Sequence, residues 1–73
     1  SDGPEPPVRR APDVTGTVTV RSGKVVLHYD GRDVELRSQK YRLDDYDGKT
    51  VRVWGTRSDD LAVLRVDVLE VVR

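Results

Sequence analysis

Apolar and polar residues alternate along residues 15–38, and two glycine-containing pairs interrupt the alternation. Ser22-Gly23 and Asp30-Gly31 are each flanked by alternating apolar residues. Such pairs favour two-residue hairpin turns, because these turns need a positive φ at their central positions. The stretch therefore predicts three antiparallel strands joined by two tight turns.

Two-residue turns fix the register of all three strands, and side-chain alternation provides a check on it. One face then carries two wholly apolar rows, Val20–Val25–Leu36 and Val18–Leu27–Val34. The other face carries two mostly polar rows, Thr19–Val26–Glu35 and Thr17–His28–Asp33. A slip of one residue would mix the two faces, so the pattern predicts this register.

The remainder of the chain predicts a cap and two further strands. Residues 39–48 break the alternation, and the spacing of two tyrosines and one leucine predicts a helical turn or an irregular cap. Residues 49–56 alternate again, with Arg52 and Trp54 expected on the outer face. Residues 61–73 predict a long last strand whose change of phase near Val68-Leu69 indicates a β-bulge. Five short strands at this spacing predict a small all-β sandwich or barrel.

Length and proline content define one folded unit and one extension. The chain has 73 residues, enough for one domain, and all four prolines lie in residues 1–12. We expect residues 1–12 to be a disordered leader or linker and residues 13–73 to form the barrel. Such a leader suits either a tether that follows a removed signal or lipid-anchor segment, or a linker between domains.

Charge and cysteine content exclude several classes of function. The 13 basic and 13 acidic residues balance, so no global basic field attracts nucleic acid or an anionic membrane. The absence of cysteine excludes a disulfide framework and a thiolate metal site. No apolar run approaches the roughly 20 residues of a membrane helix, so we expect no membrane insertion. We expect no cofactor either.

One motif carries a resemblance to a known fold family. The residues that carry it follow the pattern L-x-x-Y-x-G-K-x-V-x-V-x-G and are Leu43, Tyr46, Gly48, Lys49, Val51, Val53 and Gly55. Together with the order of elements, this motif resembles the entry to the fourth strand of small bacterial OB-fold domains, in particular those of exported or periplasmic proteins. The resemblance covers about residues 14–72 and implies a five-stranded Greek-key barrel with a short helical or irregular cap between strands three and four.

The resemblance also implies a class of function. OB-folds bind ligands across strands two and three, so the expected function is a non-catalytic binding or interaction module. Its partner would be a protein or a small polar ligand. The alternatives are a weak single-stranded nucleic-acid-binding domain and a structural domain of a longer parent chain. An exported, periplasmic or cell-envelope-tethered location is the setting we expect.

Five residues are candidates for contact with a ligand or partner. Trp54, with Arg52 on the same face, is either an exposed aromatic anchor or a ring covered by the leader or by the predicted cap of residues 39–48. The resemblance implies that the fourth strand lies beside the first, which would bring Trp54 near Thr15, Thr17 and Thr19. His28 faces Asp33 and is either an oriented imidazole or one half of a cross-strand pair.

Arg37 and Lys24 complete the set, because the predicted register gathers them with Arg21 at one end of the three strands. In the nucleic-acid alternative, Arg52, Trp54, Arg37 and Lys24 carry phosphate contact and stacking. The chain has no nucleophile–base pair at motif spacing and no phosphate-binding glycine loop before a helix, so we expect no enzyme. The aspartates of residues 44–47 and 59–60 lack calcium-loop spacing, so we expect no metal site.

Overall fold

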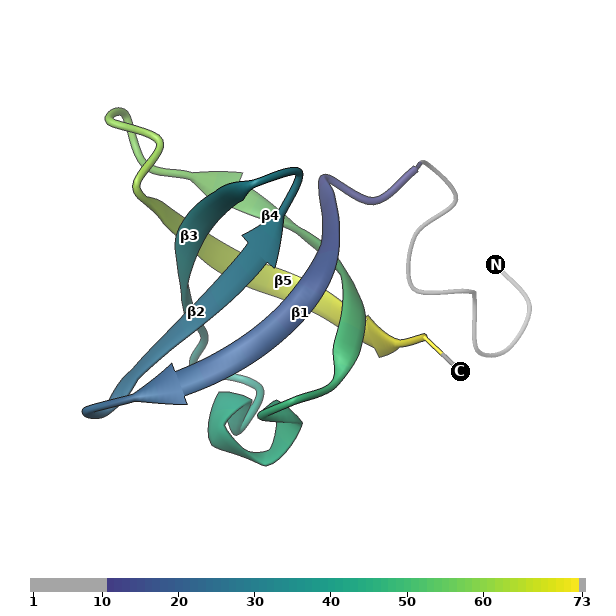
Figure 1. The fold of residues 1–73 in the computed structure, drawn as a ribbon. Coiled ribbons are helices and arrows are strands. Elements are labelled where there is room, and N and C mark those ends of the chain that lie inside the picture. The colour runs from purple at the N-terminus through teal and green to yellow at the C-terminus, as the bar shows by residue number, and fades with distance from the viewer. Residues whose placement is uncertain (1–10, 73) are drawn as a thin grey trace.

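The computed structural model describes residues 11–72, which form five strands and one short 3-10 helix. The elements are β1 (Val14–Arg21), β2 (Lys24–Tyr29), β3 (Arg32–Arg37), η1 (Leu43–Tyr46), β4 (Thr50–Arg57) and β5 (Val63–Val71). The strands close into a barrel in the order β1-β2-β3-β5-β4, with β4 returning to β1 (Figure 1). The predicted all-β, OB-like barrel with a cap between the third and fourth strands is confirmed. The predicted leader falls largely on residues 1–10, outside the described residues.

The first three strands have the predicted register. Val20 pairs with Val25, and Val25 pairs with Leu36, as the apolar rows require. Ser22 and Asp30 have φ values of 51° and 48°, and a glycine with positive φ follows each of them. The two hairpin turns thus have the left-handed backbone that their sequences indicated.

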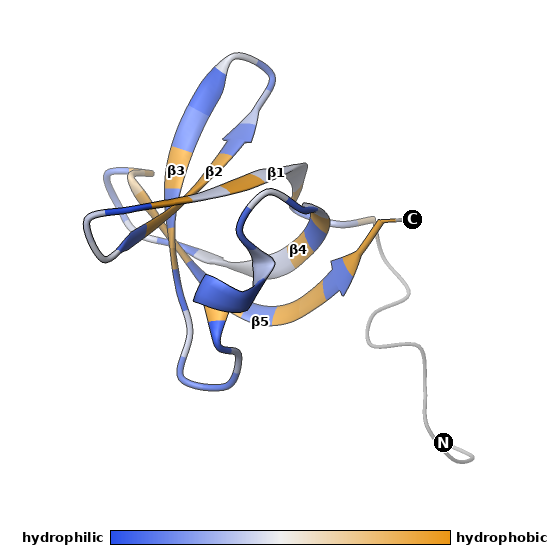
Figure 2. Ribbon diagram, turned by 60° about the horizontal axis from the view of Figure 1, so that its bottom comes forward, coloured by the Kyte–Doolittle hydropathy of each residue, from blue (hydrophilic) through white to orange (hydrophobic). Residues whose placement is uncertain are grey.

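The apolar rows of these strands form the barrel core. Leu27, Val34 and Val18 are almost completely buried, and Val51, Val53 and Leu64 join them from β4 and β5. Orange and blue segments alternate along β2 and β3 in Figure 2, as expected for strands with one face in the core and one in water.

Strand β1 is shared between two neighbours, and Gly16 lies where they meet. Residues 17–21 pair with β2, and residues 14–17 pair with β4. A Cβ atom built on Gly16 would lie 2.0 Å from the carbonyl oxygen of His28 and 3.1 Å from Cβ of Tyr29. The absence of a side chain therefore lets β1 approach β2 closely as it turns from one neighbour to the other.

Strand β5 closes the barrel by pairing with two strands in opposite senses. It is antiparallel to β4 over residues 64–71 and parallel to β3 over residues 63–65 only. The β4–β5 register shifts between Trp54 and Gly55, which lie opposite Val68 and Val66. This irregularity lies beside the predicted bulge and lets both halves of β5 direct apolar residues inward.

The connector between β3 and β4 covers one end of the barrel (Figure 1). Leu43 of η1 is buried, and Tyr41 and Tyr46 pack against the core. The turn that follows satisfies the free edge of β1, because the N–H of Val20 donates to Oδ1 of Asp47 at 3.0 Å. The N–H of Gly48 also donates to the carbonyl oxygen of Val18, at 2.8 Å.

Replacing Gly16 with alanine tests the close approach of β1 to β2. The new methyl group would meet backbone atoms of His28, which cannot move without breaking the sheet. We expect Gly16→Ala to lower the free energy of unfolding by about 1–3 kcal/mol, as in overpacked cores, in a urea titration. Thr17→Val is the control on the exposed neighbour and should change stability by less than about 0.5 kcal/mol. Equal stability of Gly16→Ala and the parent chain would contradict the described β1–β2 geometry.

Candidate functional site

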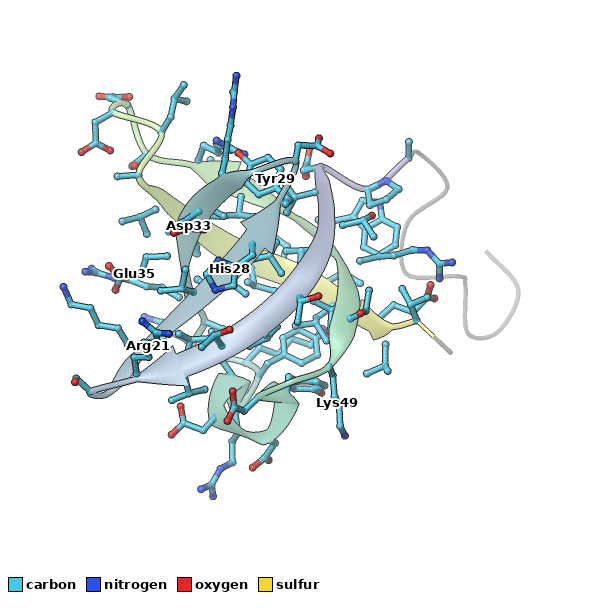
Figure 3. All side chains as sticks on the ribbon, in the orientation of Figure 1. Arg21, His28, Tyr29, Asp33, Glu35 and Lys49 are labelled. Carbon is cyan, nitrogen blue, oxygen red and sulfur yellow. The ribbon has the colours of Figure 1, made fainter. Side chains whose placement is uncertain are left out.

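Basic side chains from four strands form one row on the outside of the barrel. Arg21 pairs with Lys24 across β1 and β2, and Arg37 pairs with Arg65 across β3 and β5. Val25 of β2 pairs with Leu36 of β3. The same register, continued by one residue, places Lys24 opposite Arg37. All four side chains are exposed, and Figure 3 labels Arg21 close to the hairpin that joins β1 to β2. These four residues form the basic row.

Arg37 and Arg65, the arginine pair, lie directly opposite each other in the parallel pairing of β3 with β5. Nε of Arg37 donates to Oε2 of Glu35 at 3.1 Å, which partly balances its charge. Within residues 11–72, the side chain of Arg65 has no ion-pair or hydrogen-bond partner. Like charges directly opposite each other on neighbouring strands are destabilising. The pair therefore carries positive charge that this part of the chain leaves uncompensated.

The surface is hollowed on both sides of the arginine pair. A larger hollow of about 580 Å³ extends toward the β3–β4 connector, and its walls include Gln39, Tyr41 and Asp44. A smaller hollow of about 300 Å³ extends toward the β4–β5 loop, and its walls include Ser58 and Val63. Both members of the arginine pair line both hollows. The pair is thus a ridge between two concave surfaces that open to solvent.

The β4–β5 loop, residues 58–62, is held by hydrogen bonds among its own residues. The N–H of Ser58 donates to the carbonyl oxygen of Val63 at 2.8 Å, and the N–H of Val63 donates to Oγ of Ser58 at 3.1 Å. Oγ of Ser58 donates to Oδ1 of Asp60 at 2.6 Å, and the N–H of Ala62 donates to the same oxygen at 3.0 Å. These bonds, that of Ser58 first, favour the charged carboxylate and lower the pKa of Asp60.

Leu61 lies in this loop in an unusual conformation. Its φ is 63°, in the left-handed region where a bulky side chain costs about 1–2 kcal/mol relative to glycine. Its N–H donates to the carbonyl oxygen of Ser58 at 2.9 Å, which holds the backbone in place. The residue is 60% exposed, and Leu61 is the one exposed large apolar residue within residues 11–72. The loop therefore presents an apolar side chain to solvent in a defined position.

Arg57 joins this loop to the end of the barrel. Its guanidinium carbon lies 5.2 Å from the centre of the Tyr29 ring, and Nη2 donates to the hydroxyl oxygen of Tyr29. Nη1 donates to the carbonyl oxygen of Leu61 at 3.4 Å, a long hydrogen bond. Arg57 also lines the smaller hollow, so its charge adds to that of the arginine pair there.

His28 and Asp33 form the predicted pair on the outer face of β2 and β3. Nδ1 of His28 lies 2.5 Å from Oδ1 of Asp33, and the side chains are about half exposed for His28 and mostly exposed for Asp33 (Figure 3). The described residues 11–72 contain no group of three or more side chains placed to bind a metal ion. The geometry is that of a cross-strand pair at the surface, and a binding role for His28 stays a prediction.

Arg52 and Trp54 lie on the outer face of β4, on a different side of the barrel. Nη1 of Arg52 donates to Oε1 of Glu70 at 2.9 Å, so this cation has a partner in the sheet. Trp54 is only 5% exposed and therefore offers no open ring face in this conformation. A binding role for Arg52 and Trp54 stays a prediction.

The expected proximity of Trp54 to Thr17 and Thr19 is wrong. In the observed register Thr17 lies opposite Thr50, and β1 begins opposite Val53. The N–H of Asp13 donates to the carbonyl oxygen of Val53 at 2.9 Å, just before β1 begins. The four residues of the nucleic-acid alternative are therefore divided, with Lys24 and Arg37 on β2 and β3 and the other two on β4, beyond β5.

The positions of Arg65 and Arg57 had no signal in the sequence, and that of Leu61 had only a weak one. Arg65 alternates with apolar residues like any exposed strand residue, and its position opposite Arg37 depends on the β3–β5 pairing. The unusual backbone of Leu61 and the contact of Arg57 with Tyr29 likewise arise from tertiary structure. For Leu61, an apolar residue next to Ser58-Asp59-Asp60 was the available hint.

Comparison with protein-family models, with curated proteins and with solved structures finds no match. Within residues 11–72, no helix has the length and apolar character needed to cross a bilayer. The assignment of the fold therefore rests on topology, namely five strands in the order β1-β2-β3-β5-β4 with a cap between β3 and β4. This arrangement is that of a small OB-like β-barrel.

Acidification tests the hydrogen bonds that hold the β4–β5 loop. Because the pKa of Asp60 is lower in the folded chain, its contribution to loop order is present above the ordinary value of 3.8 and is lost as the pH falls through the lowered value. We expect the amide resonance of Ala62 to titrate with a midpoint below 3.8 in NMR spectra. Ser58→Ala should move that midpoint upward. A midpoint at or above 3.8 in the parent chain would contradict the loop geometry.

Proposed function

We propose that this chain is a non-catalytic binding module that recognises an anionic group of a protein or of a small polar ligand at the arginine pair. The observation that supports the proposal is the juxtaposition of Arg37 with Arg65, with a hollow on each side. Arg65 has no partner within residues 11–72, so its guanidinium is available to a ligand.

The chemistry of the pair favours carboxylate or phosphate oxygens. A guanidinium presents a planar fork of N–H donors that matches such groups with two parallel hydrogen bonds. An anion between the two arginines would also remove the repulsion between them. The neighbouring Lys24 and Arg21 extend the positive charge along the basic row, which raises the local concentration of anions.

Nucleic acid remains the alternative ligand, and the arrangement of aromatic residues disfavours it. The outer faces of β2 and β3 carry no aromatic side chain, whereas single-strand binders stack bases on such rings. We also propose that the protein is exported and that residues 1–12 act as its tether. This part of the proposal does not depend on the arginine pair.

A titration monitored by amide-resolved NMR at low salt tests the proposal. The probes are hexaglutamate, citrate and a dodecamer of deoxythymidine. We expect hexaglutamate to shift the amide resonances of residues 36–38 and 64–66, and Arg65→Glu to reduce these shifts at least about tenfold.

Arg32→Glu is the matched control, because Arg32 is exposed and lies on the same strand, roughly 16 Å from Arg37 at about 3.3 Å per residue. It changes the net charge equally and should leave the shifts intact. Shifts that spread evenly over the surface, or that both variants reduce equally, would refute the proposal. Tighter binding of the oligonucleotide, with a steep salt dependence, would favour the nucleic-acid alternative.

A further inference from the structure

The two hollows differ from a simple anion site because each contains an apolar surface. Tyr41 is half-buried in the wall of the larger hollow, next to the buried residues Val25 and Leu43. Val63 is half-buried in the wall of the smaller hollow. Between these two surfaces stands the arginine pair. Along the barrel surface, an apolar region is therefore followed by the two cations of the arginine pair and then by a second apolar region.

Leu61 is the exposed large apolar residue of the β4–β5 loop and is not itself part of the wall of the smaller hollow. It lies between Ser58 and Val63, which both line the smaller hollow. Its left-handed backbone and exposed side chain contribute nothing to the barrel core. Asparagine or glycine would adopt the same backbone with less strain. A strained residue held by a network of hydrogen bonds is a recognised sign of a functional position.

A polypeptide fits this pattern better than a nucleic acid or a membrane. An aliphatic side chain such as Leu61 offers no flat face on which a base can stack. Asp59 and Asp60 directly precede Leu61 and oppose its insertion into an anionic lipid surface. An extended peptide, by contrast, presents an acidic side chain between two apolar ones on one face when the three residues lie at alternate positions of its sequence.

We propose that this face binds an extended protein segment with an acidic centre and an apolar side chain on each side. The central carboxylate contacts Arg37 and Arg65, one oxygen toward each. One apolar side chain packs on Tyr41 in the larger hollow, and the other packs on Val63 and Leu61 at the smaller one. This inference rests on the proposed function and names the partner class of the same site.

Two capped synthetic peptides of eight residues test the inference by fluorescence anisotropy. Both have a central glutamate, and the residues two positions before and after it are leucine in the first and serine in the second, so that these three side chains share one face of an extended peptide. We expect the leucine peptide to bind about tenfold more tightly, since burial of each leucine adds favourable apolar contact. Leu61→Asn should weaken binding of the leucine peptide several-fold, leave the serine peptide unchanged, and keep the melting temperature equal or higher.

The remaining variants separate failure of this inference from failure of the proposed function. Arg65→Glu should abolish binding of both peptides, and Arg32→Glu should affect neither. Equal affinity of the two peptides, with binding still dependent on Arg65, would refute the apolar flanks and leave the anion site standing. Binding of neither peptide, together with an absence of hexaglutamate shifts, would refute both. A fall in melting temperature for Leu61→Asn would show that the side chain supports the fold instead.

Discussion

The short parallel pairing of β3 with β5 is the contact that closes this barrel. Three residues on each strand make it, and Leu36 and Leu64 face each other inside while Arg37 and Arg65 face each other outside. All other strand pairs are antiparallel. The same pairing thus completes the core and creates the cationic surface, so fold and proposed binding site depend on one junction.

The sequence was sufficient for the elements whose partners are close along the chain. Alternation and two turn signals predicted the register of β1, β2 and β3, because a two-residue turn fixes which residues face each other. The closure by β5 depends on residues nearly 30 positions apart, and the chain contains no local signal for a parallel partner. It followed only from the resemblance to a known fold. The register of β1 with β4 could not be predicted either, which is why Trp54 was expected beside Thr17.

The same division between local and long-range structure explains the candidate site. Lys24 and Arg37 were identified because they belong to the first three strands, whose register was known. Arg65 was missed because its neighbour is set by barrel closure, and the hollows were missed because they lie between elements. Leu61 was missed because left-handed backbone in a leucine depends on the hydrogen bonds around it. The basic row therefore forms only when the long-range strand pairing brings together residues that lie far apart in the sequence.

A double-mutant cycle measures the repulsion between Arg37 and Arg65, on which the proposed anion site depends. The free energy of unfolding is measured at low salt for Arg37→Gln, Arg65→Gln and the double variant. We expect Arg65→Gln to keep or raise stability, and the two substitutions to be coupled by about 0.2–1 kcal/mol because each one relieves the repulsion between the two arginines. The coupling should fade in high salt. Additive effects of the two substitutions would contradict the repulsion between the arginines. A fall of more than about 1 kcal/mol in the free energy of unfolding of Arg65→Gln would also contradict it and would indicate that Arg65 stabilises the fold.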